Sequence, residues 1–168
     1  MKNKPIRFLC IAGLLSALVF VLTAYVHIPS HTGYVHIGDA FIYLGACLLP
    51  LPYAPLVGAV GACLADCVSG YALWAPASVV CKAVTVFFFS SKGTKLLTAR
   101  NALATLPSAA VCVGGYYLYE ALITKNFAAP LAGVLGNVVQ SAASAVVFIA
   151  VAAALDRFKL KSKLSSQK

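Results

Sequence analysis

Three of the chain's four acidic residues and one of its lysines fall inside or at the ends of apolar sequence. These residues are Asp39, Asp66, Lys82 and Glu120. A charged side chain is costly inside a membrane, so such residues face the interior of a helix bundle and either pair or line a wet cavity. Two kinds of chemistry fit them. Either Asp39 or Asp66 forms a structural ion pair with Lys82, or these groups contact a polar ligand directly, and the sequence leaves both open.

The four charged residues are expected at similar depths, although different helices carry them. Asp39 opens one apolar segment, and Glu120 lies close to the end of another. Asp66 lies about four residues from the end of its segment, roughly 6 Å deep, and Lys82 lies about seven residues in, roughly 10 Å deep. All four therefore belong to one half of the bundle, and the other half is apolar. This pattern predicts a pocket that opens to the outside and is not a continuous pore.

Aromatic and amide side chains accompany these charges at helical spacing. Trp74 and Lys82 share one helix face, Tyr116 precedes Glu120 by four residues, and a stripe of small and polar residues runs along 133–144. Aromatic rings can stack on a flat ligand, while amides offer donors and acceptors to its edges. Interfacial anchoring and interhelical hydrogen bonding are the competing interpretations. The candidate substrate-binding residues are Tyr34, His36, Asp39, Asp66, Tyr71, Trp74, Lys82, Tyr116, Glu120, Asn137 and Gln140.

The composition indicates that membrane helices position these side chains. The 168 residues are 61% hydrophobic and only 10% charged, with a mean hydropathy of +0.91, whereas soluble domains are about one quarter charged. A membrane-spanning helix needs about 20 mostly apolar residues. The predicted fold is an all-α integral membrane protein, a single domain over residues 1–168 with six transmembrane helices. The predicted spans are 6–26, 37–49, 55–70, 72–91, 102–123 and 130–155, followed by a basic tail at 156–168.

The segment 37–70 allows two arrangements, because LPLPYAP (49–55) contains three prolines that break any helix. It forms either two short spans or a re-entrant hairpin, and two spans are favoured. Eleven of the 13 basic residues then lie on one side. The positive-inside rule puts both termini in the cytoplasm of a protein of the plasma membrane. The basic residues behind the net charge of +9 are therefore interpreted as determinants of topology and as contacts for the lipid bilayer. No nucleic-acid partner is predicted.

No motif for catalysis or for binding ATP is present. The chain lacks G-x-x-x-x-G-K-[ST], H-E-x-x-H and G-x-S-x-G, so it is not predicted to be an enzyme or to power transport by itself. The six cysteines contain no C-x-x-C pair. His27, His31 and His36 do not share one helical face, so neither a metal nor a cofactor is expected.

Two stretches carry a resemblance to a known family. HIGDAFIYLGACLLP (36–50) is followed by PLVGAVGACLADCVSGYALWAP (55–76) and then by Lys82. Over about residues 35–85 this pattern resembles the substrate-binding S components of energy-coupling factor (ECF) transporters, especially the riboflavin-type group. The resemblance implies a six-helix protein that binds a micronutrient from outside and associates with a transmembrane coupling protein and two cytoplasmic ATPases. It also implies that Gly13 and Ala17, small residues four positions apart on the first helix, dock on the coupling protein.

The sequence therefore predicts a high-affinity binding subunit for the uptake of a vitamin or related micronutrient, with residues 27–37 as a lid. Riboflavin, a pyridoxine-like vitamin and a queuosine precursor are the ligand candidates. Two alternatives remain: a small proton-coupled carrier that uses Asp66, and a non-catalytic membrane assembly factor. Uptake in a host that lacks the coupling protein and the ATPases would distinguish the carrier.

Overall fold

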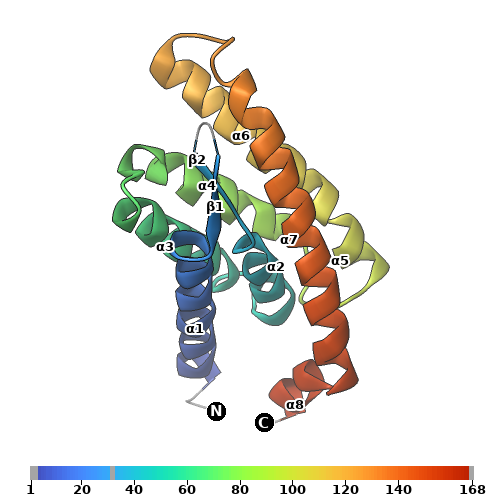
Figure 1. The fold of residues 1–168 in the computed structure, drawn as a ribbon. Coiled ribbons are helices and arrows are strands. Elements are labelled where there is room, and N and C mark those ends of the chain that lie inside the picture. The colour runs from blue at the N-terminus through green and yellow to red at the C-terminus, as the bar shows by residue number, and fades with distance from the viewer. Residues whose placement is uncertain (1–3, 31–32, 167–168) are drawn as a thin grey trace.

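Helices dominate the computed structural model, which describes residues 4–30 and 33–166 (Figure 1). The elements in chain order are α1 (Lys4–Ala24), β1 (His27–Ser30), β2 (Gly33–His36), α2 (Asp39–Leu48), α3 (Ala54–Val68), the 3₁₀ helix η1 (Ala72–Trp74), α4 (Ala75–Thr85), the 3₁₀ helix η2 (Val86–Phe88), α5 (Ala99–Leu103), α6 (Thr105–Thr124), α7 (Leu131–Arg157) and α8 (Leu160–Ser166).

Three helical stretches in the described residues are long and apolar enough to cross a membrane. They are Lys4–Ala24, Ala99–Thr124 and Leu131–Arg157, and three shorter apolar stretches cover Asp39–Leu48, Ala54–Val68 and Ala72–Phe88. All six coincide with the segments expected from the sequence. The class of the fold is that of an all-α membrane protein, whereas the number of crossings and the single-domain assignment stay predictions. Lys2 and Lys168, which contributed to the predicted orientation, lie outside the described residues.

Proline and glycine set the geometry of the short helices. Pro50 and Pro52 separate α2 from α3, and Pro55 lies in the first turn of α3, where its missing N–H is tolerated. A Cβ on Gly61 would lie 2.7 Å from the carbonyl oxygen of Ser16, and a Cβ on Gly58 would lie 2.9 Å from the Cβ of Lys82. These glycines let α3 pack closely against α1 on one side and α4 on the other, which fixes the position of Lys82.

The strands β1 and β2 pair antiparallel as a hairpin, in the region 27–37 that is expected from the sequence to be a lid. His27 pairs with His36, and Pro29 pairs with Tyr34. Residues 31–32 lie outside the described part of the chain. The ring of Tyr34 lies 4.7 Å from that of His27 and 5.7 Å from that of His36 between centroids. The Tyr34–His27 contact joins the two strands and the Tyr34–His36 contact lies within β2, so the three side chains share one face and stabilise the hairpin.

Different elements lie at the two ends of the molecule, and an apolar core lies between them. The hairpin and the connection between α6 and α7 lie at one end, while the beginning of α1 and helix α8 lie together at the other (Figure 1). Arg7 joins α1 to α8 by donating a hydrogen bond to the carbonyl of Leu164 at 2.6 Å. Between the ends lies an apolar core in which the ring of Tyr43 stacks on Phe89 at 4.8 Å and meets Phe148 edge-on at 5.8 Å. The polar site lies between this core and the hairpin.

Candidate functional site: a pocket above a buried ion pair

A pocket lies between the hairpin, α3, α4, α6 and α7. It encloses about 600 Å³, including the space at its open mouth. Its wall is built from β2, α3, the turn at Tyr71, η1, α4, α6 and α7, so the pocket exists only when these elements pack together. Its lining residues are Tyr34, Val35, His36, Asp66, Tyr71, Trp74, Ser78, Tyr116, Glu120, Gly133, Gly136, Asn137 and Gln140.

Aromatic rings form two sides of the pocket. Tyr34 of the hairpin meets Tyr71 edge-on at 5.0 Å, and Trp74 lies 6.4 Å from Tyr116 of α6. Tyr71 and Trp74 reach this position because Gly70 adopts a φ of 83°, a left-handed conformation that reverses the chain after α3. The amide N–H of Tyr71 then bonds back to the carbonyl of Asp66 at 2.8 Å. The turn therefore places two rings beside one carboxylate.

Asp66 lines the pocket with a buried carboxylate that is only partly hydrogen-bonded. The side chain is only 6% exposed, and its Oδ1 accepts a hydrogen bond from the hydroxyl of Tyr34 at 2.7 Å. Its Oδ2 has no hydrogen-bond partner among the described residues. Leaving a buried acceptor unpaired costs about 1–3 kcal/mol, so a donor on a ligand would be favoured at this atom. Glu120 also lines the pocket, and the described lining contains no lysine or arginine.

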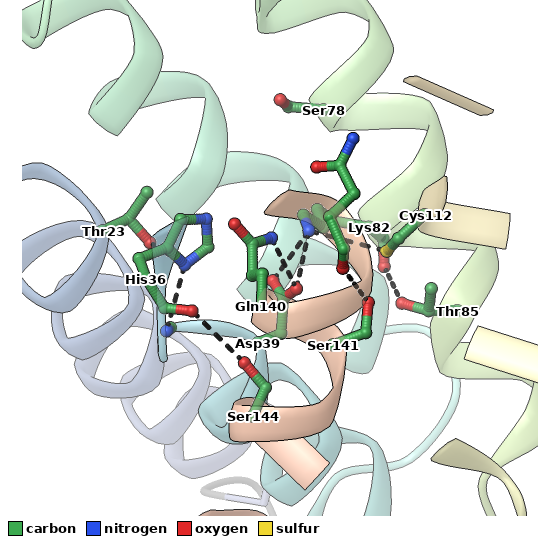
Figure 2. A network of polar contacts seen from close by, with 12 residues as sticks. Thr23, His36, Asp39, Ser78, Lys82, Thr85, Cys112, Gln140, Ser141 and Ser144 are labelled. Carbon is green, nitrogen blue, oxygen red and sulfur yellow. Dashed lines mark hydrogen bonds and ion pairs between the residues drawn. The ribbon is translucent and has the colours of Figure 1, made fainter. Parts of the chain in front are cut away.

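Asp39 and Lys82 form an ion pair beneath the pocket. The ammonium nitrogen of Lys82 lies 2.8 Å from both carboxylate oxygens of Asp39, and both side chains are 1% exposed. Lys82 also contacts the sulfur of Cys112 at 3.6 Å, and the amide of Gln140 donates to Asp39 Oδ2 at 3.2 Å. Figure 2 shows these four side chains converging from α2, α4, α6 and α7. The pair therefore ties four helices together and neutralises the one lysine near the pocket.

Two side chains connect the pocket to the ion pair. Gln140 lines the pocket and bonds Asp39 with the same amide group. The ring of Tyr116 lies 5.3 Å from the ammonium of Lys82, and its hydroxyl shares a 2.7 Å hydrogen bond with Ser78. Cation–π contact of this kind favours the charged lysine. The lining of the pocket therefore includes two groups that also stabilise the pair.

His36 anchors the hairpin to the bundle. Its Nδ1 accepts the N–H of Gly38 at 3.1 Å and lies 3.4 Å from the hydroxyl of Thr23, while its carbonyl accepts from Ser144 at 3.4 Å (Figure 2). Because Nδ1 is an acceptor here, the ring is neutral with its proton on Nε2. Burial lowers the pKa of His36 to about 4, which agrees with that assignment.

Most of the predicted site residues gather in one place. Nine of the eleven candidates line the pocket, whereas Asp39 and Lys82 do not. Their mutual contact and their burial keep Asp39 and Lys82 out of the lining, so ligand contact by these two residues stays an untested prediction. Of the two acids considered as a partner for Lys82, Asp39 is the one that pairs.

Five residues of the site were not among the candidates. Ser78, Gly133 and Gly136 belong to the polar helical stripes that the sequence displays, so periodicity could have added them. Val35 lines the pocket from a strand, and Cys112 contacts Lys82. Neither residue type carries a signal for such a role.

The first helix exposes the small residues proposed for docking. Gly13 and Ala17 are exposed, whereas Ala12 and Ser16 are buried. A Cβ on Gly13 would meet nothing within 4 Å. The buried pair packs inside the bundle, where Ser16 donates to the carbonyl of Leu56 at 3.4 Å. The exposed pair is therefore free of an intramolecular packing role.

One family model matches nearly the whole chain. The model, described as the ECF-type riboflavin transporter, S component, matches residues 3–157. No curated protein matches the chain significantly.

Proposed function

Because the chain belongs to the family of ECF-type riboflavin transporter S components, we propose that it is a high-affinity binding subunit for riboflavin or a closely similar flat heteroaromatic micronutrient. Membership of this family makes the chain a substrate-binding subunit of a transporter and not a catalytic protein. The observation that supports this ligand is the combination of aromatic walls with the unpaired Oδ2 of Asp66.

The pocket offers complementary groups to such a molecule. Rings at Tyr71, Trp74 and Tyr116 can stack on a planar heterocycle. A flavin ring carries an imide N–H between two carbonyls, so Asp66 Oδ2 can accept the N–H while the amide of Asn137 pairs with a carbonyl. Two carboxylates and no basic residue in the described lining favour a neutral ligand over a phosphorylated one.

The proposal includes the topology and the partners predicted from the sequence. Six spans in the plasma membrane with both termini in the cytoplasm would open the pocket to the outside. A transmembrane coupling protein would dock on the exposed face at Gly13 and Ala17, and two cytoplasmic ATPases would supply the energy. The exposure of these two residues supports the docking surface.

Titration of purified protein with riboflavin tests the proposal, because binding to aromatic walls quenches flavin fluorescence. We expect a submicromolar Kd for the wild type. Asp66→Asn should weaken binding about 10- to 100-fold, since a hydrogen bond to a charged group contributes about 1.5–3 kcal/mol. Leu135→Ala is the matched control, because Leu135 lies on α7 near Asn137 but is 73% exposed.

Three results would contradict the proposal or parts of it. Absence of riboflavin binding by folded protein rejects this ligand, and equal affinity in Asp66→Asn rejects the role of Asp66. Uptake of riboflavin in cells that lack the coupling protein and ATPases would instead support an independent carrier.

A further inference from the structure

A second pocket lies at the end of the molecule opposite the hairpin. It is bounded by the beginning of α1, the end of α2, the segment after η2 and helix α8, and it encloses about 990 Å³ including its open side. It shares no lining residue with the pocket described above. Three basic residues, Lys4, Arg7 and Lys161, line it together with the apolar side chains of Phe8, Ile11 and Leu48.

Lys161 is a buried cation that forms no ion pair with any residue that the structure describes. The side chain is 7% exposed, and its ammonium donates to the carbonyls of Lys95 at 3.2 Å and Lys92 at 3.5 Å. Both acceptors are neutral. The one acidic residue nearby, Asp156, already accepts the N–H groups of Leu96 and Leu97 at 2.8 and 2.9 Å. Burial lowers the pKa of Lys161, because the charged ammonium is partly removed from water. An anion in the pocket would therefore offset the free-energy cost of burying this charge.

Arg7 and Lys4 add to the positive charge that Lys161 gives this pocket. The half-buried guanidinium of Arg7 donates to the Leu164 carbonyl at 2.6 Å, which uses one of its five N–H donors. Lys4 is exposed at the rim. No acidic residue lines this pocket among the residues that the structure describes. The wall is therefore positive on one side.

The remaining wall is apolar and continues onto the outer surface of α1. The ring of Phe8 contacts Tyr53 at 5.6 Å, and Ile11 and Leu48 lie beside it in the lining. On the outward face of the same helix, Ile6 is 62% exposed and Leu9 is 56% exposed. Because α1 is long and apolar enough to cross a membrane, these side chains face acyl chains. A basic recess at the end of such a helix lies at headgroup level.

We propose that this pocket binds an anionic membrane phospholipid, with the headgroup phosphate between Arg7 and Lys161 and one acyl chain along Phe8 and Ile11. A phosphate oxygen supplies the anionic acceptor that Lys161 lacks, and arginine suits phosphate because its donors form a planar fork. The apolar wall favours a lipid over free phosphate. Bound lipid would join α1, the segment 91–95 and α8 at the inner end.

Native mass spectrometry of delipidated protein tests the proposal directly. Phosphatidylglycerol and phosphatidylcholine with identical acyl chains are titrated separately, with inorganic phosphate as a soluble competitor. We expect the wild type to bind phosphatidylglycerol at least about tenfold more tightly than phosphatidylcholine. Arg7→Gln and Lys161→Gln should each reduce that preference severalfold, whereas Lys161→Arg should retain it.

Arg100→Gln is the matched control, because Arg100 is exposed and outside the lining, so this substitution removes one positive charge without changing the pocket. If Lys161→Gln does not fold, Arg7→Gln and Lys161→Arg still test whether this pocket binds the anionic lipid. Equal binding of both lipids overturns the proposal, as does an equal loss in Arg100→Gln, which would indicate bulk attraction alone. Displacement of the lipid by millimolar inorganic phosphate would assign the site to a free anion. None of these readouts involves riboflavin, so the proposal stands or fails independently of the vitamin.

Discussion

Replacing Lys82 with methionine should strongly destabilise the protein. Lys82→Met keeps most of the side-chain volume but removes the cation that lies 2.8 Å from both oxygens of Asp39. The carboxylate would remain 1% exposed, with Gln140 as its hydrogen-bond donor. Breaking a buried pair by removing one partner typically costs about 3–5 kcal/mol. For a protein of this size that corresponds to a fall in Tm of roughly 6–20 °C.

The double variant isolates the interaction between the two charges. Asp39→Asn alone leaves the ammonium buried beside Cys112, so it should be about as destabilising as Lys82→Met. Asp39→Asn combined with Lys82→Met removes both charges. The decrease in the free energy of unfolding of this double variant should be well below the sum of the decreases in the two single variants. The difference between that sum and the double variant measures the coupling energy.

A thiol-reactive fluorophore provides the assay, since Cys47, Cys81 and Cys112 are buried and react only when the bundle opens. Lys92→Met is the control, because the same chemical change at an exposed lysine should alter stability by less than about 0.5 kcal/mol. A melting temperature for Lys82→Met within about 2 °C of the wild type would refute the reasoning. Simple additivity in the double variant would refute it as well.

Three further predictions concern other parts of the molecule. Gly61→Ala should cost about 1–3 kcal/mol in thermal unfolding, because its methyl group would lie 2.7 Å from the Ser16 carbonyl, whereas Gly13→Ala should not. Gly13→Leu combined with Ala17→Leu should leave riboflavin binding intact but prevent co-purification with the coupling protein; unchanged co-purification would exclude this docking face. Because the folded pKa of His36 is lowered to about 4 from an ordinary value of 6.5, its unfolded form binds the proton first, and stability should fall by up to about 3 kcal/mol as pH drops through this window. A Tm that does not change between pH 7 and 4 would contradict that assignment.

The helices and the grouping of most of the polar residues around one pocket could be predicted from the sequence, because both depend on local pattern. Apolar runs and prolines such as Pro50 bound the helices, and the spacing of Asn137 and Gln140 places them on one face of α7. The partner of Lys82 could not be predicted in this way. Asp39 and Asp66 come from different helices, and Lys82 meets Asp39 because of how α2, α3 and α4 pack, which spacing along the chain does not encode.

The hairpin and the second pocket could not be predicted from the sequence, for different reasons. A strand of four residues gives too short a pattern, and the pairing of His27 with His36 depends on contacts across a turn. Lys161 and Arg7 were interpreted as topology signals, an interpretation that explains their position but not their burial. Burial of a basic residue is a property of tertiary structure, so composition alone cannot reveal it.

The hydrogen bond between Tyr34 and Asp66 joins the hairpin to α3 at the wall of the proposed binding site. Tyr34 takes one acceptor position on Oδ1 of the carboxylate, and Oδ2 has no partner among the described residues. In the proposed site, a ligand with a single N–H would bond Oδ2 while Tyr34 stays in place, whereas a guanidinium that bonds both oxygens would compete with Tyr34 for Oδ1. Discrimination between ligands and the position of the hairpin would then depend on the same carboxylate.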